Sequence, residues 1–136
     1  MFSIDYRSRT PLYQQLIENI EQLVLRGVLT ADTQLPSVRS LAVELSINPN
    51  TVSRAITELE SRGIIYTVPG RGSFIAADQT ALLDRAEGKL RSSLMEFAKS
   101  AHQLGLGKEN WLHLCEQAYS NSTEATSSLK EDTPHA

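Results

Sequence analysis

Short hydrogen-bonding side chains and a single arginine gather on the polar face of a segment near the middle of the chain. If this segment is helical, at about 100° per residue, these side chains lie opposite its apolar stripe or beside it. They are Asn50, Thr51, Ser53, Arg54, Thr57 and Ser61. A merely solvated helix usually carries glutamate and lysine there, whereas short polar groups with one guanidinium suit close approach to base edges and phosphates. An ordinary polar helix face is the alternative, and this face alone does not decide between the two.

Two short helices joined by a tight turn are predicted to position this face. The first covers Val38–Leu45 with Ser37 as its N-cap, and the second opens at the Asn48-Pro49 pair, an N-cap followed by proline at the first helical position. Gly63 stands where a left-handed C-cap belongs. Only residues 46–47 separate the two helices, which is the helix-turn-helix pattern.

A β-hairpin is predicted directly after the second helix. Residues 64–68 are β-branched and aromatic, and residues 73–76 form a short second strand. Between them Gly70 and Gly72 free the backbone to turn tightly or to approach another surface closely, and Arg71 stands at the tip. A hairpin with a cationic tip after a helix-turn-helix is a wing. A plain hairpin with a soluble tip is the alternative, which Arg71 alone does not exclude.

Three ordered stretches carry a resemblance to a known family. LPSVRSLA, NPNTVSRAITELESRG and the hairpin with GRGSF resemble the winged helix-turn-helix of GntR-family bacterial transcription regulators. The resemblance extends back to PLYQQLIENIEQLVLRGVL and covers residues 6–76. It implies a sequence-specific regulator, a repressor rather than an activator, that binds a double-stranded DNA operator.

The resemblance also implies roles for individual residues. Arg39 contacts a base or a phosphate, the polar face of the second helix enters the major groove, and Arg71 reaches the minor groove or its phosphates. The predicted DNA-binding residues are Ser37, Arg39, Asn50, Thr51, Ser53, Arg54, Gly70, Arg71 and Gly72. One departure is Pro49, where other family members can place an arginine. Base reading is therefore expected to pass to Arg54 and to the wing.

A third helix is predicted over residues 12–26, preceded by a short arm over residues 1–10. The helix starts at the Thr10-Pro11 pair and ends at Gly27, and its apolar residues recur at helical spacing. It is expected to pack across the other two helices and close a three-helix core. The predicted fold is therefore mainly α with a small β-hairpin, a winged helix-turn-helix over residues 1–77.

Composition is that of an ordinary globular chain. The protein has 136 residues, 40% of them hydrophobic and 21% charged. No run approaches the roughly 20 apolar residues that cross a bilayer, and no signal peptide is recognisable, so a cytoplasmic location without membrane contact is expected. The net charge of −3 comes from the residues after position 76. DNA binding would therefore depend on a few well-placed arginines, with modest non-specific affinity.

A helical hairpin is predicted after the wing. Residues 78–120 are assigned as a two-helix dimerisation segment, starting at an Asp78 or Thr80 cap, and residues 121–136 as a disordered tail. The first helix carries a heptad-like seam of Leu90, Leu94, Phe97, Ala101 and Leu104. Docking on its own winged helix is the alternative, but the seam is long and favours a homodimer. Such a short C-terminal segment resembles the YtrA-like branch of the family.

Residues for catalysis are not apparent. His102, His113 and His135 have no metal-like spacing with acidic residues or with the single Cys115, and no nucleophile can be paired with a base. We predict no enzymatic activity, metal or cofactor.

Two other hypotheses remain open beside the DNA-binding regulator. One is a winged-helix protein–protein module; the other is a regulator whose C-terminal helices bind a small-molecule effector between Phe97, Trp111 and Tyr119.

Overall fold

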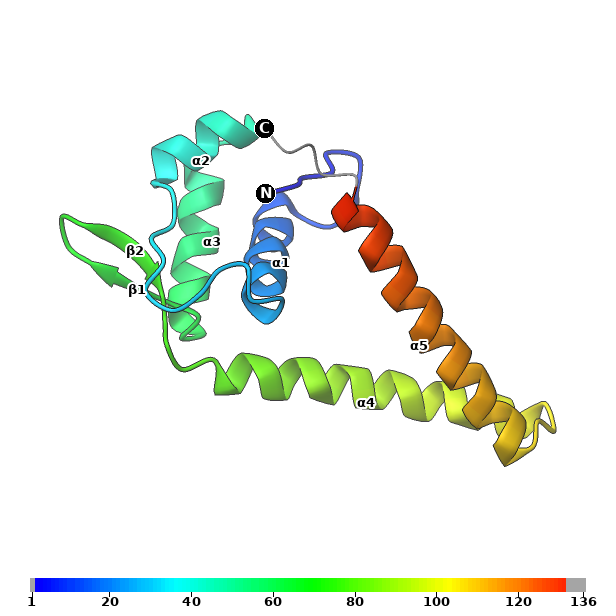
Figure 1. Cartoon of the computed structure of the whole chain (residues 1–136). Coiled ribbons are helices and arrows are strands. Elements are labelled where there is room, and N and C mark those ends of the chain that lie inside the picture. The colour runs from blue at the N-terminus through cyan, green and yellow to red at the C-terminus, as the bar shows by residue number, and fades with distance from the viewer. Residues whose placement is uncertain (1, 132–136) are drawn as a thin grey trace. The chain divides into compact units, whose positions relative to one another are not determined.

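Five helices and one two-stranded hairpin make up the part of the chain that the structure describes (Figure 1). The computed structural model describes the backbone of residues 2–131 and the side chains of residues 2–123. The elements are α1 (Leu12–Leu25), α2 (Val38–Leu45), α3 (Pro49–Ser61), β1 (Ile65–Val68), β2 (Gly72–Ile75), α4 (Thr80–Gln103) and α5 (Lys108–Glu131). The predicted fold class, mainly α with a small β-hairpin, is confirmed.

One apolar core joins α1, α2, α3 and the hairpin. The apolar stripes of the three helices face inward, and Leu29 and Leu35 of the loop between α1 and α2 join them. The largest fully buried side chains are Leu16, Ile17, Ile20, Leu41, Val52, Leu59, Ile64 and Ile75. Each buried side chain of this size stabilises the fold by about 1.5–3 kcal/mol. This core fixes which face of each helix stays outside.

Local capping explains where α2 and α3 begin. The Ser37 hydroxyl accepts a hydrogen bond from the Ser40 N–H at 3.1 Å, and the Asn48 side chain accepts one from the Asn50 N–H at 2.8 Å. Both caps were predicted. The Thr10 cap was not confirmed: Pro11, with an extended ψ of 145°, is the N-cap of α1 and makes no side-chain cap bond. The Thr10 carbonyl instead accepts the Gln15 side-chain amide.

The N-terminal arm folds back on α1 instead of extending away from it. Ser3 exchanges hydrogen bonds with the Asn19 side chain, at 2.9 Å in both directions. Asp5 does the same with Gln15, a buried polar residue whose amide is thereby satisfied. The Tyr6 hydroxyl donates to the Leu45 carbonyl, which ties the arm to α2.

Two compact units divide the chain, residues 1–87 and residues 88 onward. The predicted boundary lay after residue 77, but the first turns of α4 belong to the N-terminal unit. Leu82 is 3% exposed in the winged-helix core. Asp78 starts the helix by accepting hydrogen bonds from the Thr80 hydroxyl and backbone N–H, and these bonds hold the pKa of its carboxyl below the usual value.

The last helix is longer than the sequence indicates. We predicted α5 to end near Tyr119 and a disordered tail from residue 121, whereas α5 continues to Glu131. The hydroxyls of Ser122 and Thr123 donate to the carbonyls four residues earlier, so these polar side chains stay within the helix. The rest of the predicted tail, residues 132–136, lies outside the described residues.

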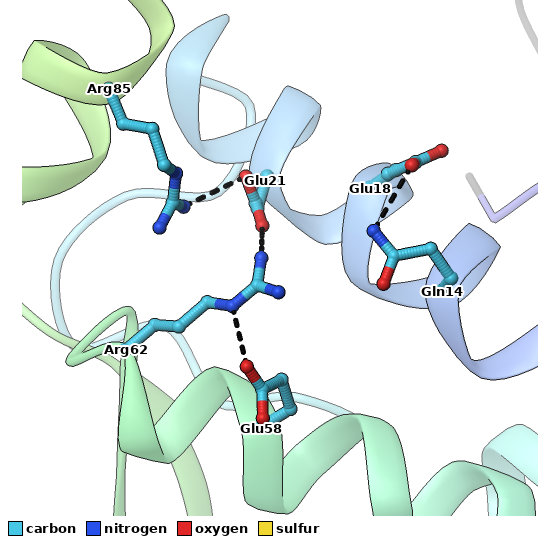
Figure 2. Close-up of polar contacts among 6 residues, drawn as sticks. All are labelled: Gln14, Glu18, Glu21, Glu58, Arg62 and Arg85. Atoms are coloured by element: carbon cyan, nitrogen blue, oxygen red, sulfur yellow. Dashed lines mark hydrogen bonds and ion pairs between the residues drawn. The ribbon is translucent and has the colours of Figure 1, made fainter.

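A shared carboxylate links three helices of the N-terminal unit (Figure 2). Glu21 of α1 accepts from Arg62, the C-cap of α3, at 2.6 Å and from Arg85 of α4 at 3.2 Å. Arg62 also contacts Glu58 at 2.9 Å. Burial lowers the pKa of the Arg62 guanidinium, but the hydrogen bonds and charges of Glu58 and Glu21 outweigh this and raise it above its usual value. The Glu21 side chain is 15% exposed, so it is the least screened member of the network.

Removing the shared carboxylate charge should destabilise the unit. We expect Glu21→Gln to lower the free energy of unfolding by about 1–2 kcal/mol, because Arg62 loses a partly buried ionic partner, while the more exposed Arg85 contributes little. Chemical denaturation followed by circular dichroism measures the difference. Glu18→Gln is the matched control, since Glu18 is exposed on the same helix and accepts a hydrogen bond from the uncharged Gln14 side chain. Equal losses in the two variants would contradict the role given to Glu21.

Candidate nucleic-acid interface

The N-terminal half of α3 presents the polar face that the sequence predicts. Asn50, Ser53 and Arg54 are exposed and Thr51 is half-buried. The apolar stripe on the other side is buried at Val52, Ala55 and Leu59. No acidic residue occurs between Pro49 and Thr57. The two glutamates farther along are held by other groups: Glu58 binds Arg62, and Glu60 accepts from the Thr67 hydroxyl at 3.2 Å. This half of α3 therefore offers hydrogen-bonding groups and a positive charge without a neighbouring negative one.

Arg54 has a neighbour on another helix. Its guanidinium carbon lies 3.7 Å from the centroid of the Tyr13 ring of α1. This is a cation–π geometry, in which the ring attracts the cation through the negative potential of its face. Tyr13 was not among the predicted site residues, because nothing in the local sequence indicates which helix its ring meets.

The start of α2 carries the next two predicted residues. Arg39 is exposed in the first turn of α2. The Ser37 hydroxyl is used within the protein, since it caps α2 and also donates to the Ser40 hydroxyl at 3.0 Å. Ser37 thus defines the helix N-terminus, whose backbone N–H groups favour an anion.

The hairpin has the predicted wing geometry. Strands β1 and β2 pair antiparallel, with Val68 opposite Gly72. The Arg71 N–H donates to the Val68 carbonyl at 2.9 Å and closes the turn, in which Gly70 has a left-handed φ of 77°. Arg71 is exposed at the tip. Tyr66 and Phe74 stack with ring centroids 5.5 Å apart and stiffen the strands below it.

A third segment, which the sequence analysis did not predict, pairs with the wing. Residues 32–35 belong to the loop between α1 and α2 and lie antiparallel to β2, with Gln34 opposite Phe74. The Leu35 N–H donates to Ser73 at 2.8 Å, and the Ile75 N–H donates to Thr33 at 2.9 Å. The Gln34 side chain reaches the tip and donates to the Arg71 carbonyl at 2.7 Å. The segment is too short to show a strand pattern of its own.

A cavity of about 200 Å³ lies between the start of α2 and the tip of the wing. It is lined by Gln34, Leu35, Pro36, Ser37, Val38, Ile56, Arg71, Gly72 and Ser73. Of the predicted site residues it brings together Ser37, Arg71 and Gly72. The predicted residues of α3 do not line it. The candidate surface therefore has two parts, the face of α3 and the junction of α2 with the wing.

The C-terminal unit carries an apolar groove of about 590 Å³ between α4 and α5. The predicted seam forms one wall, and its large members are exposed, from 50% at Leu94 to 86% at Leu104; only Ala101 is buried. Trp111, Cys115 and Tyr119 line the α5 side. Cys115 is therefore a groove residue and not part of a closed core.

Two other kinds of site are not seen in the described part of the chain. No three His, Cys, Asp or Glu side chains come together there as a metal site would require. None of the helices described is both long and apolar enough to cross a membrane.

Comparisons with known proteins agree with this geometry. Residues 12–75 match the family model of bacterial regulatory proteins, gntR family. The HTH-type transcriptional repressor YtrA of Bacillus subtilis is 41% identical over 110 residues, which cover 80% of this chain and 85% of YtrA. A transcriptional regulator from Oenococcus oeni is 31% identical with a TM-score of 0.72, and the match covers 88% of this chain and 99% of that one. The DNA-binding domain of AraR in complex with operator ORX1 is 29% identical with a TM-score of 0.50, over 54% and 92% of the two chains.

The contact between Gly72 and Gln34 leads to a prediction about the wing. A Cβ at Gly72 would lie 2.9 Å from the Gln34 amide nitrogen, and the φ of +123° is unfavourable for any side chain. We expect Gly72→Ala to displace the Gln34 amide from the Arg71 carbonyl and to cost about 1–3 kcal/mol of stability. The amide-proton shifts of the Gln34 side chain and a denaturation curve measure both effects.

Gly70→Ala is the control for this prediction. Gly70 also has positive φ, but a Cβ there would meet nothing within 4 Å. Its substitution should strain the backbone without moving Gln34. If the Gln34 resonances respond equally to both variants, the contact does not hold the wing.

Proposed function

The chain belongs to the gntR family of bacterial regulatory proteins and is a DNA-binding transcription regulator, and we propose that it represses its targets by binding a palindromic operator as a homodimer. The observation that carries the proposal is the exposed polar face of the N-terminal half of α3, which contains no acidic residue. Such a face can enter the major groove and hydrogen-bond to base edges. The predicted cytoplasmic location is consistent with a role on chromosomal DNA.

Each part of the surface takes one role in the proposed complex. Asn50, Ser53 and Arg54 enter the major groove, and Thr51 contacts a phosphate at the start of α3. Arg39 contacts DNA from α2, whose N-terminus is defined by Ser37. Proline at position 49 has no side-chain donor, so Arg54 is the main candidate to read a base on α3.

The wing takes the second DNA contact. Arg71 reaches the minor groove or its bordering phosphates, and the glycines on either side of it let the backbone come close. The wing is suited to this because its tip is tied to Gln34 and its strands are joined by a third segment. A tip held in this way loses little conformational freedom on binding.

A second copy of the chain is the proposed occupant of the C-terminal groove. The seam leaves four large apolar side chains exposed over one continuous surface, and a symmetric partner would cover the same surface on both chains. One recognition helix reads only a few base pairs, so two-fold symmetry multiplies the discrimination and requires a palindromic operator.

A small-molecule effector is a second candidate for the groove. The groove is apolar and is walled by Phe97, Trp111 and Tyr119, which could contact an aromatic or aliphatic ligand. An effector there would act on the dimer and so on DNA binding. Thermal unfolding distinguishes the two occupants, because a bound effector shifts the thermal stability of the protein as the effector concentration rises.

Neutralising the tip of the wing should weaken binding to DNA of any sequence. We expect Arg71→Ala to leave the thermal unfolding curve unchanged and to lower the slope of log affinity against log salt concentration by about 1. Fluorescence anisotropy with a duplex at several salt concentrations measures this slope. Arg26→Ala is the charge-matched control, because Arg26 is exposed at the far end of α1. An unchanged Arg71→Ala slope means that the tip does not contact phosphate. A wild-type protein with no salt-dependent DNA binding would favour the protein–protein module.

Placing a charge in the seam should separate the two chains. We expect Leu94→Glu to be a folded monomer that loses affinity for a palindromic site by about 100-fold or more and binds a single half-site unchanged. Light scattering gives the mass, and circular dichroism checks the fold. Met95→Glu is the matched control, since Met95 is an exposed neighbour that does not line the groove. A wild-type monomer that binds a palindrome tightly and without cooperativity would overturn the proposed dimer.

A further inference from the structure

Arg54 is held by an aromatic ring and by no acidic group. Its guanidinium carbon lies 3.7 Å from the Tyr13 ring centroid. In the part of the chain that the structure describes, Arg54 forms no ion pair and donates no hydrogen bond to another protein group. This differs from Arg62 at the end of α3 and Arg85 of α4, which both bind Glu21.

The choice of an aromatic partner has a chemical consequence. The five N–H donors of a guanidinium lie in its plane and point outward, whereas the ring contacts its face. A carboxylate partner would occupy two of these donors and neutralise the charge. Tyr13 therefore restricts the orientation of Arg54 and leaves its charge and its donors free for another ligand.

Tyr13 is itself well fixed. It is half-buried and packs against the apolar core, two residues before the buried Gln15. The Gln15 side-chain amide donates hydrogen bonds to the Asp5 and Thr10 carbonyls. The ring is thus part of the rigid scaffold of α1, while Arg54 projects from the exposed face of α3. A flexible side chain that packs against a fixed ring loses less conformational entropy when it binds a ligand.

We propose that Tyr13 is a positioning residue for DNA recognition, which orients Arg54 before the operator binds and thereby sets the base discrimination at the Arg54 contact. This inference rests on the proposed function, in which Arg54 reads a base. It assigns part of the specificity to α1, a helix that lies outside the helix-turn-helix. The aromatic ring of Tyr13 makes the contact with Arg54, so the Tyr13 hydroxyl should not be needed for this role.

A double-mutant cycle on the full-length protein tests the proposal. The DNA is an operator obtained by selection from random sequences, together with duplexes in which single base pairs are exchanged. We expect Tyr13→Leu to lower operator affinity about two- to fivefold, a range set by the strength of exposed cation–π contacts, and to reduce discrimination at one base pair. Tyr13→Phe should keep both, and Tyr13→Leu combined with Arg54→Ala should bind no more weakly than Arg54→Ala alone.

Several results would overturn the proposal. Loss of affinity by Tyr13→Leu that is equal on every DNA sequence would make its role structural. A Tyr13→Phe variant as weak as Tyr13→Leu would assign the effect to the hydroxyl. Additive losses in the double variant would show that the two residues act separately. An Arg54→Ala variant with unchanged affinity and discrimination would instead refute the DNA contact of Arg54, and with it the proposed function on which the inference rests.

A measurement on the free protein remains if Tyr13→Leu fails to fold. The ring current of Tyr13 should shift the NMR signals of the Arg54 side chain in the wild-type protein and in Tyr13→Phe alike. Arg54 signals at their random-coil positions in both proteins would overturn the proposed contact without any DNA experiment.

Discussion

Burial of one stripe of α3 against α1 determines what the opposite face of α3 can do. Val52, Ala55 and Leu59 are all 0% exposed, so the rotation of α3 about its axis is fixed by the core. With about 100° between successive residues, Asn50, Ser53 and Arg54 must then face outward. The recognition surface is therefore a geometric consequence of the core, and the same packing that stabilises the fold brings the Tyr13 ring of α1 against Arg54.

The wing depends on pairing outside itself. A two-stranded hairpin is marginally stable alone, and the strands here contain only four residues each. The segment over residues 32–35 adds backbone hydrogen bonds to β2, and Gln34 ties the turn through the Arg71 carbonyl. Because this segment leads directly into Pro36 and the Ser37 cap, the position of the wing tip and the start of α2 are set together.

The N-terminal unit also determines how α4 begins. Leu82 inserts into the core, and Arg85 shares the Glu21 carboxylate with Arg62, the C-cap of α3. The first turns of α4 are therefore part of the DNA-binding unit, and the apolar groove belongs to the second unit, beyond residue 87. Helix α4 thus runs from the DNA-binding unit into the second unit. It therefore connects the proposed DNA contact to the proposed dimer contact.

The sequence by itself determined the local features: the helices α1 to α3, the Ser37 and Asn48 caps, the turn at Gly70 and the polar face of α3. Each depends on residues within a few positions of one another, where periodicity and capping act. Only the tertiary structure decided the pairing of residues 32–35 with β2, the contact of Tyr13 with Arg54, and the sharing of Glu21 by Arg62 and Arg85. These contacts join residues that lie far apart in the chain, and they form only after the core has fixed which faces meet. The end of α5 also differed, because the helix continues through hydroxyl residues whose composition is typical of disorder.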